Sequence, residues 1–331
     1  MNKNIDKLKA IIGRSSKVAI FSHTNPDGDA LGSCIAWSNI LKKMGHDVRF
    51  FVPNSYPSFL EWVSKELGET DIFFGKEDQK DFIKNAEVMF FMDLNNLSRT
   101  DGMAETIFPN KDAKKILIDH HPEPDTDFDI SFSHPEMSST SLIVYNLIIE
   151  GGLEHLLDIN IATALYVGMS TDTGNFTFGN LNPELYSALA KIVNQGINPA
   201  LLNVRLYNNY TKDRMKLLGH LLDNKMVFIE NTEAAYIYLS KADQHAFNFK
   251  QGDSEGFVNY PLYIEGVNLS AMFIQTNECI KISLRSKGDI DVNNLARKYF
   301  NGGGHKNASG GKCFEGMEKA IETFVNAVKE K

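Results

Sequence analysis

Three short runs of apolar residues in the first part of the chain end in histidine or aspartate, and this pattern restricts the fold more than any other feature. The runs are KVAIFSH (17–23), EVMFFMD (87–93) and KKILIDHH (114–121). Together with DVRFFVP (47–53), they are rich in β-branched and aromatic residues and alternate with helix-like segments. Strands that alternate with helices predict a mostly parallel sheet covered on both faces, so we expect an α/β fold.

The chain changes character near residue 200, which predicts a second domain. At 331 residues it is long for a single hydrophobic core. The segment 196–222 resembles a helical connector, and after it the chain becomes rich in β-type segments, starting with KMVFIE. We therefore expect an α/β domain over 1–195, the connector over 196–222, and a smaller α/β domain over 223–331.

Composition favours a soluble protein of the cytoplasm. Hydrophobic residues make up 43% and charged residues 23% of the chain, which is typical of globular proteins. No apolar stretch reaches about 18 residues, so we expect no membrane span, and the first residues do not have the pattern of a signal peptide. The cysteines Cys34, Cys279 and Cys313 are scattered, which argues against a disulfide framework and against a thiolate metal site.

Net charge restricts the partners. The formal net charge is −8, and the sequence has no basic run of the kind that neutralises many phosphates of a long nucleic acid. Short phosphorylated substrates held in a local pocket remain compatible with this charge.

The polar residues at the strand ends predict a metal site. The carboxyl ends of parallel strands meet at one edge of the sheet, so these side chains converge. A further cluster, YVGMSTDTGNF (166–176), adds Asp172 in a turn rich in Ser, Thr and Gly. The carboxylates of Asp27, Asp29, Asp93 and Asp172 would repel one another without cations, and two divalent ions would balance their four charges. The set contains two imidazoles and no thiolate, which suits Mn²⁺ best, with Mg²⁺, Fe²⁺, Co²⁺ or Zn²⁺ as substitutes. The six predicted ligands are His23, Asp27, Asp29, Asp93, His120 and Asp172.

A structural reading competes at each of these positions. A single histidine at a strand end commonly makes a structural hydrogen bond, and Asp-Gly-Asp is ordinary turn chemistry. The convergence of several clusters decides in favour of a metal site. The remaining histidines and Cys34 lie outside these clusters, so the argument does not make them ligands. We expect surface or structural roles for His46, His134, His155, His220 and His245 and a packing role for Cys34.

Five motifs in the same order resemble the DHH phosphoesterase superfamily with a DHHA1 domain. They are HTNPDGD (23–29), the lone strand-end Asp93, DHH (119–121), STDTG (170–174) and GGGHKNASG (302–310). Within the superfamily, the two-domain layout is similar to the nanoRNase and pAp phosphatase group, which includes exopolyphosphatase-related proteins. The resemblance covers nearly the whole chain.

The resemblance implies how the ligands divide between two ions. One ion would be held by His23, Asp27 and Asp93, and the other by Asp29, Asp93, His120 and Asp172. Asp93 would then bridge the ions. Asp119 would orient a histidine, and His121 would lie beside the reacting phosphate, so Asp93, Asp119 and His121 form the implied catalytic set.

The implied reaction is hydrolysis of a phosphoester. Two ions about 3.5 to 4 Å apart can activate a water and stabilise the charge that develops on phosphorus. The substrate would be held by Arg285 at a strand end and by the glycine-rich segment with Gly303, Gly304, His305 and Asn307. Arg99 is a further basic residue near the site, expected either to contact substrate or to tether a loop.

Several functions remain open. The leading one is release of nucleoside monophosphates from short RNA, or of phosphate from pAp (3'-phosphoadenosine 5'-phosphate). A soluble phosphodiesterase for cyclic di-AMP or pApA and an exopolyphosphatase are alternatives. A long-strand exonuclease and an inorganic pyrophosphatase are disfavoured, because an additional nucleic-acid domain and the pyrophosphatase substrate motifs are missing. A non-catalytic nucleotide-binding module is disfavoured because all six ligand types are present. Relatives are often dimers, so a homodimer is an expectation of the resemblance alone.

Overall fold

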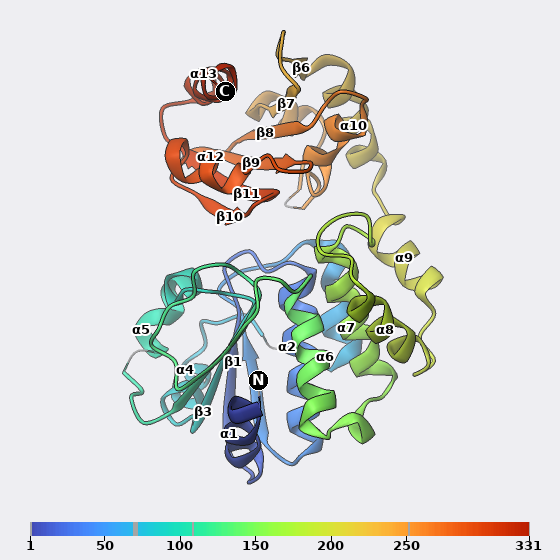
Figure 1. The fold of residues 1–331 in the computed structure, drawn as a ribbon. Coiled ribbons are helices and arrows are strands. Elements are labelled where there is room, and N and C mark those ends of the chain that lie inside the picture. The colour runs from blue at the N-terminus through green and yellow to red at the C-terminus, as the bar shows by residue number, and fades with distance from the viewer. Residues whose placement is uncertain (1, 69–71, 108, 251, 331) are drawn as a thin grey trace. The chain divides into compact units, whose positions relative to one another are not determined.

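The computed structural model describes residues 2–68, 72–107, 109–250 and 252–330 (Figure 1). The chain forms two compact units, Met1–Asn209 and Tyr210–Lys331. The division falls inside the expected connector 196–222, between α9 (Pro199–Tyr207) and α10 (Lys212–Asn224). Leu202 and Leu206 of α9 belong to the core of the first unit, so this helix is part of that unit.

A five-stranded parallel sheet forms the centre of the first unit. Its spatial order is β2-β1-β3-β4-β5, and every neighbouring pair is parallel. The strands are β1 (Lys17–Phe21), β2 (Asp47–Phe51), β3 (Val88–Met92), β4 (Lys114–Asp119) and β5 (Ile130–Ser133). The expected α/β fold with a mostly parallel sheet is confirmed. β5, a strand of only four residues at the sheet edge, was not predicted from the sequence.

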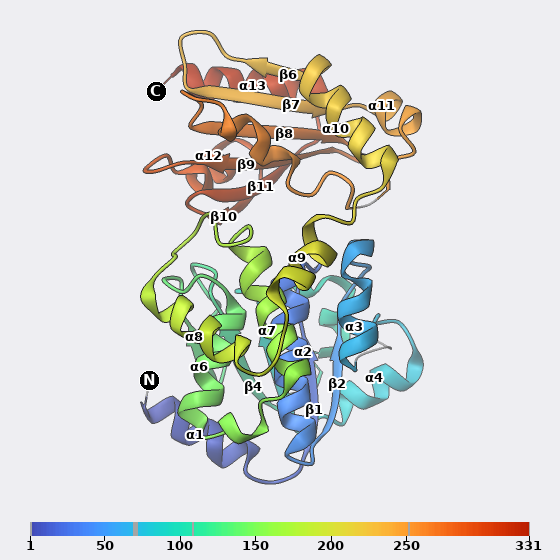
Figure 2. The same ribbon diagram turned by 90° about the vertical axis from the view of Figure 1, so that its right-hand side faces the viewer.

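Helices cover both faces of this sheet (Figures 1 and 2). Val18 and Ile20 of β1 pack into a core shared with α1, α2, α6 and α7, whereas Ala19 and Phe21 pack on the opposite face with α4 and α5. Successive side chains of a strand point to opposite faces of the sheet. Because helices cover both faces here, β1 needs apolar residues at successive positions. The helices are α1 (Asn2–Ile12), α2 (Gly28–Lys43), α3 (Glu61–Leu67), α4 (Glu77–Lys84), α5 (Ala104–Ile107), α6 (Thr140–Gly151), α7 (Ile159–Asp172) and α8 (Pro183–Val193), with the 3-10 turns η1 (Ser58–Leu60), η2 (Leu97–Met103) and η3 (Glu154–Leu156).

Strand order places the site. In the order β2-β1-β3, the chain leaves β1 for one neighbour and returns on the other side, so the crevice between the carboxyl ends of β1 and β3 is the switch point where ligands bind in such sheets. The helices α2 and α7 pack closely against each other. A Cβ atom on Gly32 of α2 would lie only 2.8 Å from the backbone nitrogen of Gly168 in α7, so glycine permits this contact.

The second unit is built on a six-stranded mixed sheet with the order β10-β11-β9-β8-β7-β6. In Figure 2, α10 lies on one face of this sheet and α13 on the other. Leu284 and Phe324 belong to the core under α12 and α13, and Leu217 belongs to the core under α10. The expected smaller α/β domain is confirmed. Its elements are β6 (Met226–Phe228), β7 (Ala234–Leu239), α11 (Lys241–Ala246), η4 (Phe257–Tyr263), β8 (Leu269–Gln275), β9 (Ile280–Ser286), α12 (Val292–Tyr299), β10 (Gly303–His305), β11 (Ala308–Cys313) and α13 (Met317–Lys329). Over the described residues of both units, no helix combines the length and the apolar character needed to span a membrane.

Candidate metal centre

His23 follows β1 and presents one ring nitrogen to the sheet edge. Its Nδ1 lies 2.8 Å from the carbonyl oxygen of Thr24, which can only accept, so Nδ1 carries the hydrogen. Its Nε2 lies 3.4 Å from Oδ2 of Asp93. A histidine whose far nitrogen is fixed by a backbone carbonyl is the usual arrangement for a metal ligand, because the bond sets both the tautomer and the ring direction.

Asp27 and Asp29 occupy the amino terminus of α2. Oδ1 of Asp27 caps the helix, accepting from the backbone nitrogens of Asp29 and Ala30 at 3.0 Å each. The carboxylate of Asp29 accepts from the backbone nitrogens of Thr140 at 2.6 Å and Ser141 at 2.9 Å, at the amino terminus of α6. The positive end of α6 therefore stabilises a negative charge on Asp29.

Asp93 lies at the centre of the site and has a constrained backbone. It follows β3, is 2% exposed, and has a φ of 58°, in the left-handed region that few residues other than glycine adopt. Its backbone nitrogen donates to the carbonyl of Ile118 at 3.0 Å, which holds this turn against the neighbouring strand β4. Strained residues of this kind concentrate at functional sites.

His120 and Asp172 close the other side of the site. Nδ1 of His120 donates to the carbonyl of Met137 at 3.3 Å. Its Nε2 lies 3.4 Å from Oδ2 of Asp172, 3.7 Å from Oδ1 of Asp93 and 4.0 Å from Oδ2 of Asp29. Asp172 is the last residue of α7, whereas the sequence suggested that it lies in the turn that follows. The helix dipole at that end favours cations beside it.

The six predicted ligands thus come together in two groups. Ligand atoms of His23, Asp27 and Asp93 lie within 4.8 Å of one another, and so do those of Asp29, His120 and Asp172. The 3.7 Å distance from His120 to Asp93 joins the groups. Nitrogen and carboxylate oxygen donors in this mixture fit a divalent transition metal.

Asp119 and His121 form a hydrogen-bonded pair beside these groups. Nδ1 of His121 lies 2.8 Å from Oδ1 of Asp119, and the backbone nitrogen of His121 donates to Oδ2 of Asp119 at 3.0 Å. Asp119 is fully buried. Burial, followed by the charge of Asp93, raises the pKa of Asp119 to about 7, and burial lowers the pKa of His121 well below its ordinary value. Both shifts favour the uncharged forms of these two groups.

Electrostatics in the two groups reflect crowded carboxylates. Burial, and then the charges of Asp93 and Asp172, raise the pKa of Asp29 well above its ordinary value. Burial alone would raise the pKa of Asp93 too, but its hydrogen bond with His23 and the charges of nearby histidines hold it well below the ordinary value.

The histidines supply the balancing positive charge. Burial opposes protonation of His120, yet the carboxylates of Asp172, Asp93 and Asp29 outweigh it and raise the pKa to about 9. The pKa of His23 is also raised, because its hydrogen bond with Asp93 overcomes the effect of burial. The carboxylates raise the pKa of both imidazoles although the rings are buried, which indicates that the site favours positive charge, such as that of a bound cation.

Arg99 lies on the loop next to His23. Its carbonyl oxygen accepts from the backbone nitrogen of Thr24 at 2.8 Å and from the Thr24 hydroxyl at 2.9 Å. After burial, the positive charge of Arg99 is among the influences that lower the pKa of His121. The Arg99 backbone thus tethers the loop, while its side chain charge acts on the site.

In the second unit, Arg285 and His305 share a face of the sheet. Ala308 of β11 pairs with Arg285 of β9 on one side and with His305 of β10 on the other. Directly paired residues point the same way, so the two side chains project from one face, about 10 Å apart at two strand spacings. Leu284, the neighbour of Arg285, packs into the core with α12 and α13, so this face is the opposite one.

The glycine-rich segment is a hairpin, which differs from the flexible turn that its composition alone would indicate. Residues 303–305 and 308–310 are paired, with Lys306 and Asn307 in the turn. The backbone nitrogen of Gly304 donates to Oδ1 of Asn293 at 3.0 Å, so it is already engaged, while Gly303 lies in the paired strand. Nδ2 of Asn307 donates to Oγ of Ser286 at 2.9 Å and to the carbonyl of Gly288 at 3.1 Å, so this amide holds the neighbouring loop.

Two residues of the site were not predicted from the sequence. Thr140 and Ser141 bind Asp29 through their backbone nitrogens, and Ser139 caps α6. The signal was present, because a Ser or Thr before an apolar helical run marks a helix start, where backbone nitrogens are available to an anion. His46 has the structural role that was expected. It is buried, with Nε2 bonded to the carbonyl of Ile12 at 3.0 Å.

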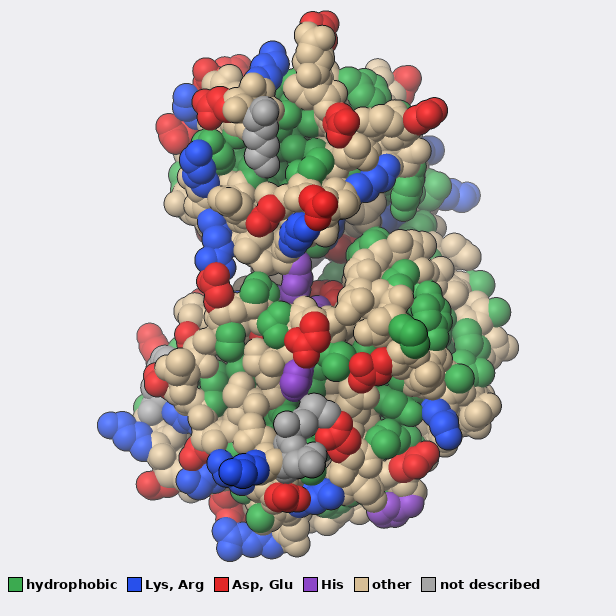
Figure 3. All heavy atoms as spheres, in the orientation of Figure 1, with side chains coloured by type: hydrophobic (Ala, Val, Ile, Leu, Met, Phe, Trp, Pro, Cys, Tyr) green, Lys and Arg blue, Asp and Glu red, His purple; other side chains and the backbone are tan. Residues whose placement is uncertain are grey.

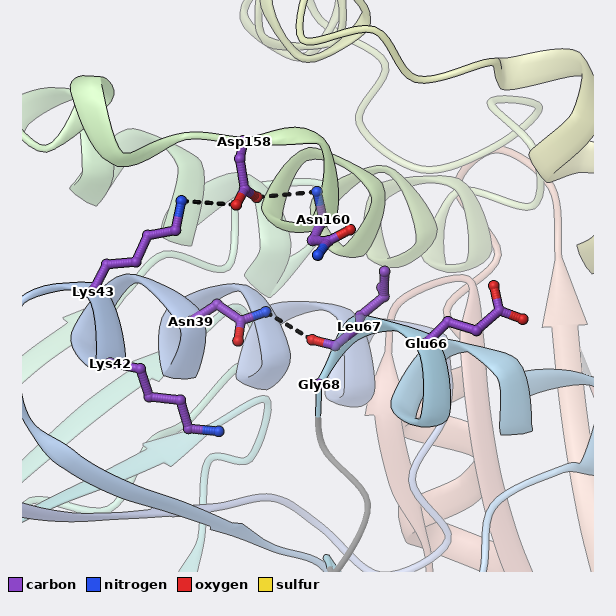
Figure 4. A pocket seen from close by; sticks show the side chains of 8 residues that line it. All are labelled: Asn39, Lys42, Lys43, Glu66, Leu67, Gly68, Asp158 and Asn160. Atoms are coloured by element: carbon purple, nitrogen blue, oxygen red, sulfur yellow. Dashed lines mark hydrogen bonds and ion pairs between the residues drawn. The ribbon is translucent and has the colours of Figure 1, made fainter.

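A cavity at the far end of α2 is separate from this centre. Its volume is about 380 Å³, and it is lined by Asn39, Lys42, Lys43, Glu66, Leu67, Gly68, Asp158 and Asn160. Figure 4 shows Lys43 pointing to Asp158, 2.7 Å away, and Asn39 pointing to the backbone of Leu67. Fourteen residues of helix separate Lys43 from Asp29, or about 20 Å at 1.5 Å per residue.

Charge on the surface is mixed. On the face of each unit that Figure 3 shows, basic side chains lie scattered among acidic ones, and the described residues there form no continuous basic band.

Comparison with known proteins places the chain in a family. The model of the DHH family, N-terminal domain, matches residues 17–169, and the DHHA1 domain matches residues 231–331. The chain belongs to the DHH family. The resemblance drawn from the five motifs is therefore confirmed.

Relatives match over nearly the full chain. The bifunctional oligoribonuclease and PAP phosphatase NrnA of Thermus thermophilus is 30% identical over 98% of this chain and 91% of its own length. The protein of the same name from Bacillus subtilis is 28% identical over 90% of this chain and 89% of its own. An exopolyphosphatase-related protein from Bacteroides fragilis is 38% identical, with a TM-score of 0.93, over 100% of this chain and 96% of that one.

Proposed function

We propose that this protein is a divalent-metal-dependent phosphoesterase that hydrolyses short oligoribonucleotides to nucleoside monophosphates and pAp to AMP and phosphate. The meeting of two groups of ligand side chains at Asp93 is the observation that carries this proposal. The names of the Thermus and Bacillus relatives, which match the chain over most of its length, supply the substrate class.

The first ion would be held by His23, Asp27 and Asp93, and the second by Asp29, Asp93, His120 and Asp172. Both histidines already direct Nε2 inward, because each Nδ1 is bonded to a backbone carbonyl. We assign Mn²⁺ to both positions on the mixture of imidazole and carboxylate donors, with Mg²⁺, Co²⁺, Fe²⁺ or Zn²⁺ as substitutes. When bound, two such ions would lower the pKa of a water molecule and stabilise the charge that develops on the phosphate.

Asp119 and His121 would manage a proton near the reacting phosphate. The Asp119 carboxylate fixes the ring of His121 through Nδ1, so Nε2 is the atom that would accept a proton or bond to a phosphate oxygen. Burial lowers the pKa of His121, which favours the neutral form of the ring.

We assign substrate contacts to basic side chains of each unit. Arg99 supplies positive charge beside His121, and Arg285 offers a planar guanidinium that matches phosphate oxygens. We assign His305, on the same sheet face as Arg285, and Gly303 and Gly304, which allow a close approach, to the same role. Asn307 would act indirectly by holding the loop at Gly288.

Three further expectations complete the proposal. The composition favours a cytoplasmic location. The family resemblance implies a homodimer, which size-exclusion chromatography with light scattering tests. The boundaries 1–195, 196–222 and 223–331 are likewise the functional division we propose, with the metals in the first domain and substrate contacts in the second.

Hydrolysis assays test the function. The purified protein is incubated with Mn²⁺ and one of five substrates: pAp, a 5'-labelled RNA trinucleotide, pApA, cyclic di-AMP or polyphosphate. We expect turnover of the first two, loss of turnover with excess EDTA, and recovery with added Mn²⁺. Preferred hydrolysis of polyphosphate would favour the activity that the name of the Bacteroides protein suggests. Tight nucleotide binding with no turnover of any substrate would instead indicate a non-catalytic module.

A further inference from the structure

The hydroxyl and the backbone of one threonine reach two different carboxylates of the metal centre. Thr140 is the first residue of α6 and is fully buried. Its backbone nitrogen donates to Oδ2 of Asp29 at 2.6 Å, and its hydroxyl donates to Oδ1 of Asp93 at 3.0 Å. No motif singled out in the sequence includes this residue.

The hydroxyl bond fixes the rotation of the Asp93 carboxylate. Oδ2 of Asp93 faces His23 at 3.4 Å, and Oδ1 faces His120 at 3.7 Å. A carboxylate that bridges two ions through its two oxygens directs one oxygen toward each, so the orientation of its plane matters. A bond from the Thr140 hydroxyl uses one lone pair of Oδ1 and leaves another, which keeps this orientation without removing the oxygen from the centre.

The backbone bond fixes the second carboxylate from the same residue. Ser139 caps α6 by accepting from the backbone nitrogen of Leu142 at 3.1 Å, so the start of the helix is rigid. The nitrogens of Thr140 and Ser141 then hold both oxygens of Asp29. One end of α6 thereby sets the distance between Asp29, a ligand proposed for one ion, and Asp93, proposed for both.

We propose that Thr140 is a positioning residue that couples the two metal positions by orienting Asp93 and Asp29 together. This role rests on the proposed dinuclear function. Side chains that orient metal ligands typically contribute about 10- to 100-fold in metal affinity or activity.

Four variants test the proposal. Thr140→Val keeps the shape and the backbone nitrogen but removes the hydroxyl, and Thr140→Ala removes it without placing a methyl group against Asp93. Thr140→Ser keeps the hydroxyl. The matched control is Thr163→Val, because Thr163 is only 9% exposed and its hydroxyl bonds to the carbonyl of Ile159 within α7, at 2.7 Å.

Mn²⁺ binding is measured from the electron paramagnetic resonance signal of the free ion, alongside steady-state kinetics and thermal unfolding of the metal-free proteins. For Thr140→Val and Thr140→Ala we expect Mn²⁺ affinity weaker by about 10- to 100-fold at one position or both, a matching loss in kcat, and KM changed by less than about threefold. Thr140→Ser and Thr163→Val retain wild-type affinity. The readout besides activity is the count and affinity of the ions.

The outcomes separate the two proposals. If the wild type binds two Mn²⁺ ions and both hydroxyl-free variants bind them equally well, the role of Thr140 is overturned while the dinuclear centre stands. If the wild type binds fewer than two ions, the dinuclear centre itself is contradicted, and the role of Thr140 falls with it.

Discussion

A Cβ atom on Gly168 of α7 would lie 2.6 Å from Oδ1 of Asp29, so the carboxylate occupies space that only glycine leaves open. The same atom would also collide with the side chain of Ser141. Three elements, α2, α6 and α7, therefore meet at Asp29, and their packing positions the carboxylate of this proposed ligand.

Gly168→Ala should displace Asp29 and weaken metal binding. Overpacking of a buried site typically costs about 1–3 kcal/mol, which should appear as a lower melting temperature, and Mn²⁺ affinity should fall as well. Gly219→Ala is the control, because Gly219 lies in α10 with open space around its Cβ position. Calorimetric titration with Mn²⁺ checks the prediction, and wild-type affinity in Gly168→Ala would refute this account of the packing.

Replacement of Asp93 should affect both ions, whereas replacement of Asp172 should affect one. Asparagine is the suitable substitute at position 93, because it tolerates the left-handed backbone found there. We expect Asp93→Asn to lose tight binding of both ions and all measurable turnover, and Asp172→Asn to retain one ion. Metal analysis of the purified variants after dialysis decides this. Two tightly bound ions in Asp93→Asn would exclude a bridging role.

The strand-end pattern made most of the first unit predictable. Strands covered on both faces appear in the sequence as continuous apolar runs, which makes them easy to identify. Once parallel strands are identified, their carboxyl ends define the edge of the sheet where ligands bind. His23, Asp93 and His120 could therefore be picked out as candidate ligands from their places at the strand ends, and the structure brings them together with Asp27, Asp29 and Asp172. Whether Asp172 ended the helix or entered the next turn did not follow, because helix ends are set by local capping and packing.

Other features depended on long-range contacts that one sequence does not reveal. Thr140 acquires its role only because α6 packs beside α2, which brings residues 111 positions apart together. The hairpin at Gly303–His305 forms because Gly302 and Gly304 approach the opposite strand closely, and composition alone does not distinguish that strand from a loop. β5 has only four residues and a mixed pattern, too short for periodicity to identify.

Loss of the Asp119 carboxylate should reduce turnover while both ions stay bound. In Asp119→Asn the amide would no longer hold the proton on Nδ1 of His121 in the same way, so the ring loses its fixed tautomer. We expect kcat to fall by about 10- to 100-fold with an unchanged metal count. His155→Ala, at an exposed position, should behave as the wild type. Loss of an ion in Asp119→Asn would instead make Asp119 a ligand.

Removal of divalent ions should destabilise the protein. Because the proposed ions bind the folded first unit only, Mn²⁺ at 100 times its dissociation constant should add about 2.7 kcal/mol per independent position to the free energy of unfolding. Thermal unfolding with EDTA and with increasing Mn²⁺ measures this. The shift should be abolished in Asp93→Asn, and a melting temperature that does not respond to Mn²⁺ in the wild type would contradict ion binding.

Arg285→Ala should raise KM for pAp and for RNA of two to five nucleotides without changing the metal count, because Arg285 is a proposed substrate contact in the second unit, whereas the proposed ion ligands belong to the first. Loss of a charged hydrogen bond of about 1.5–3 kcal/mol corresponds to roughly a 10- to 100-fold increase. The matched control is Lys281→Ala, which removes a cation from the same face of β9 at an exposed position four residues away. In the same assay the wild type should prefer these short RNAs over a 24-mer, a length preference that the family resemblance implies. Equal kcat/KM across the length series would refute the short-substrate preference, and an unchanged KM in Arg285→Ala would remove Arg285 from the substrate site.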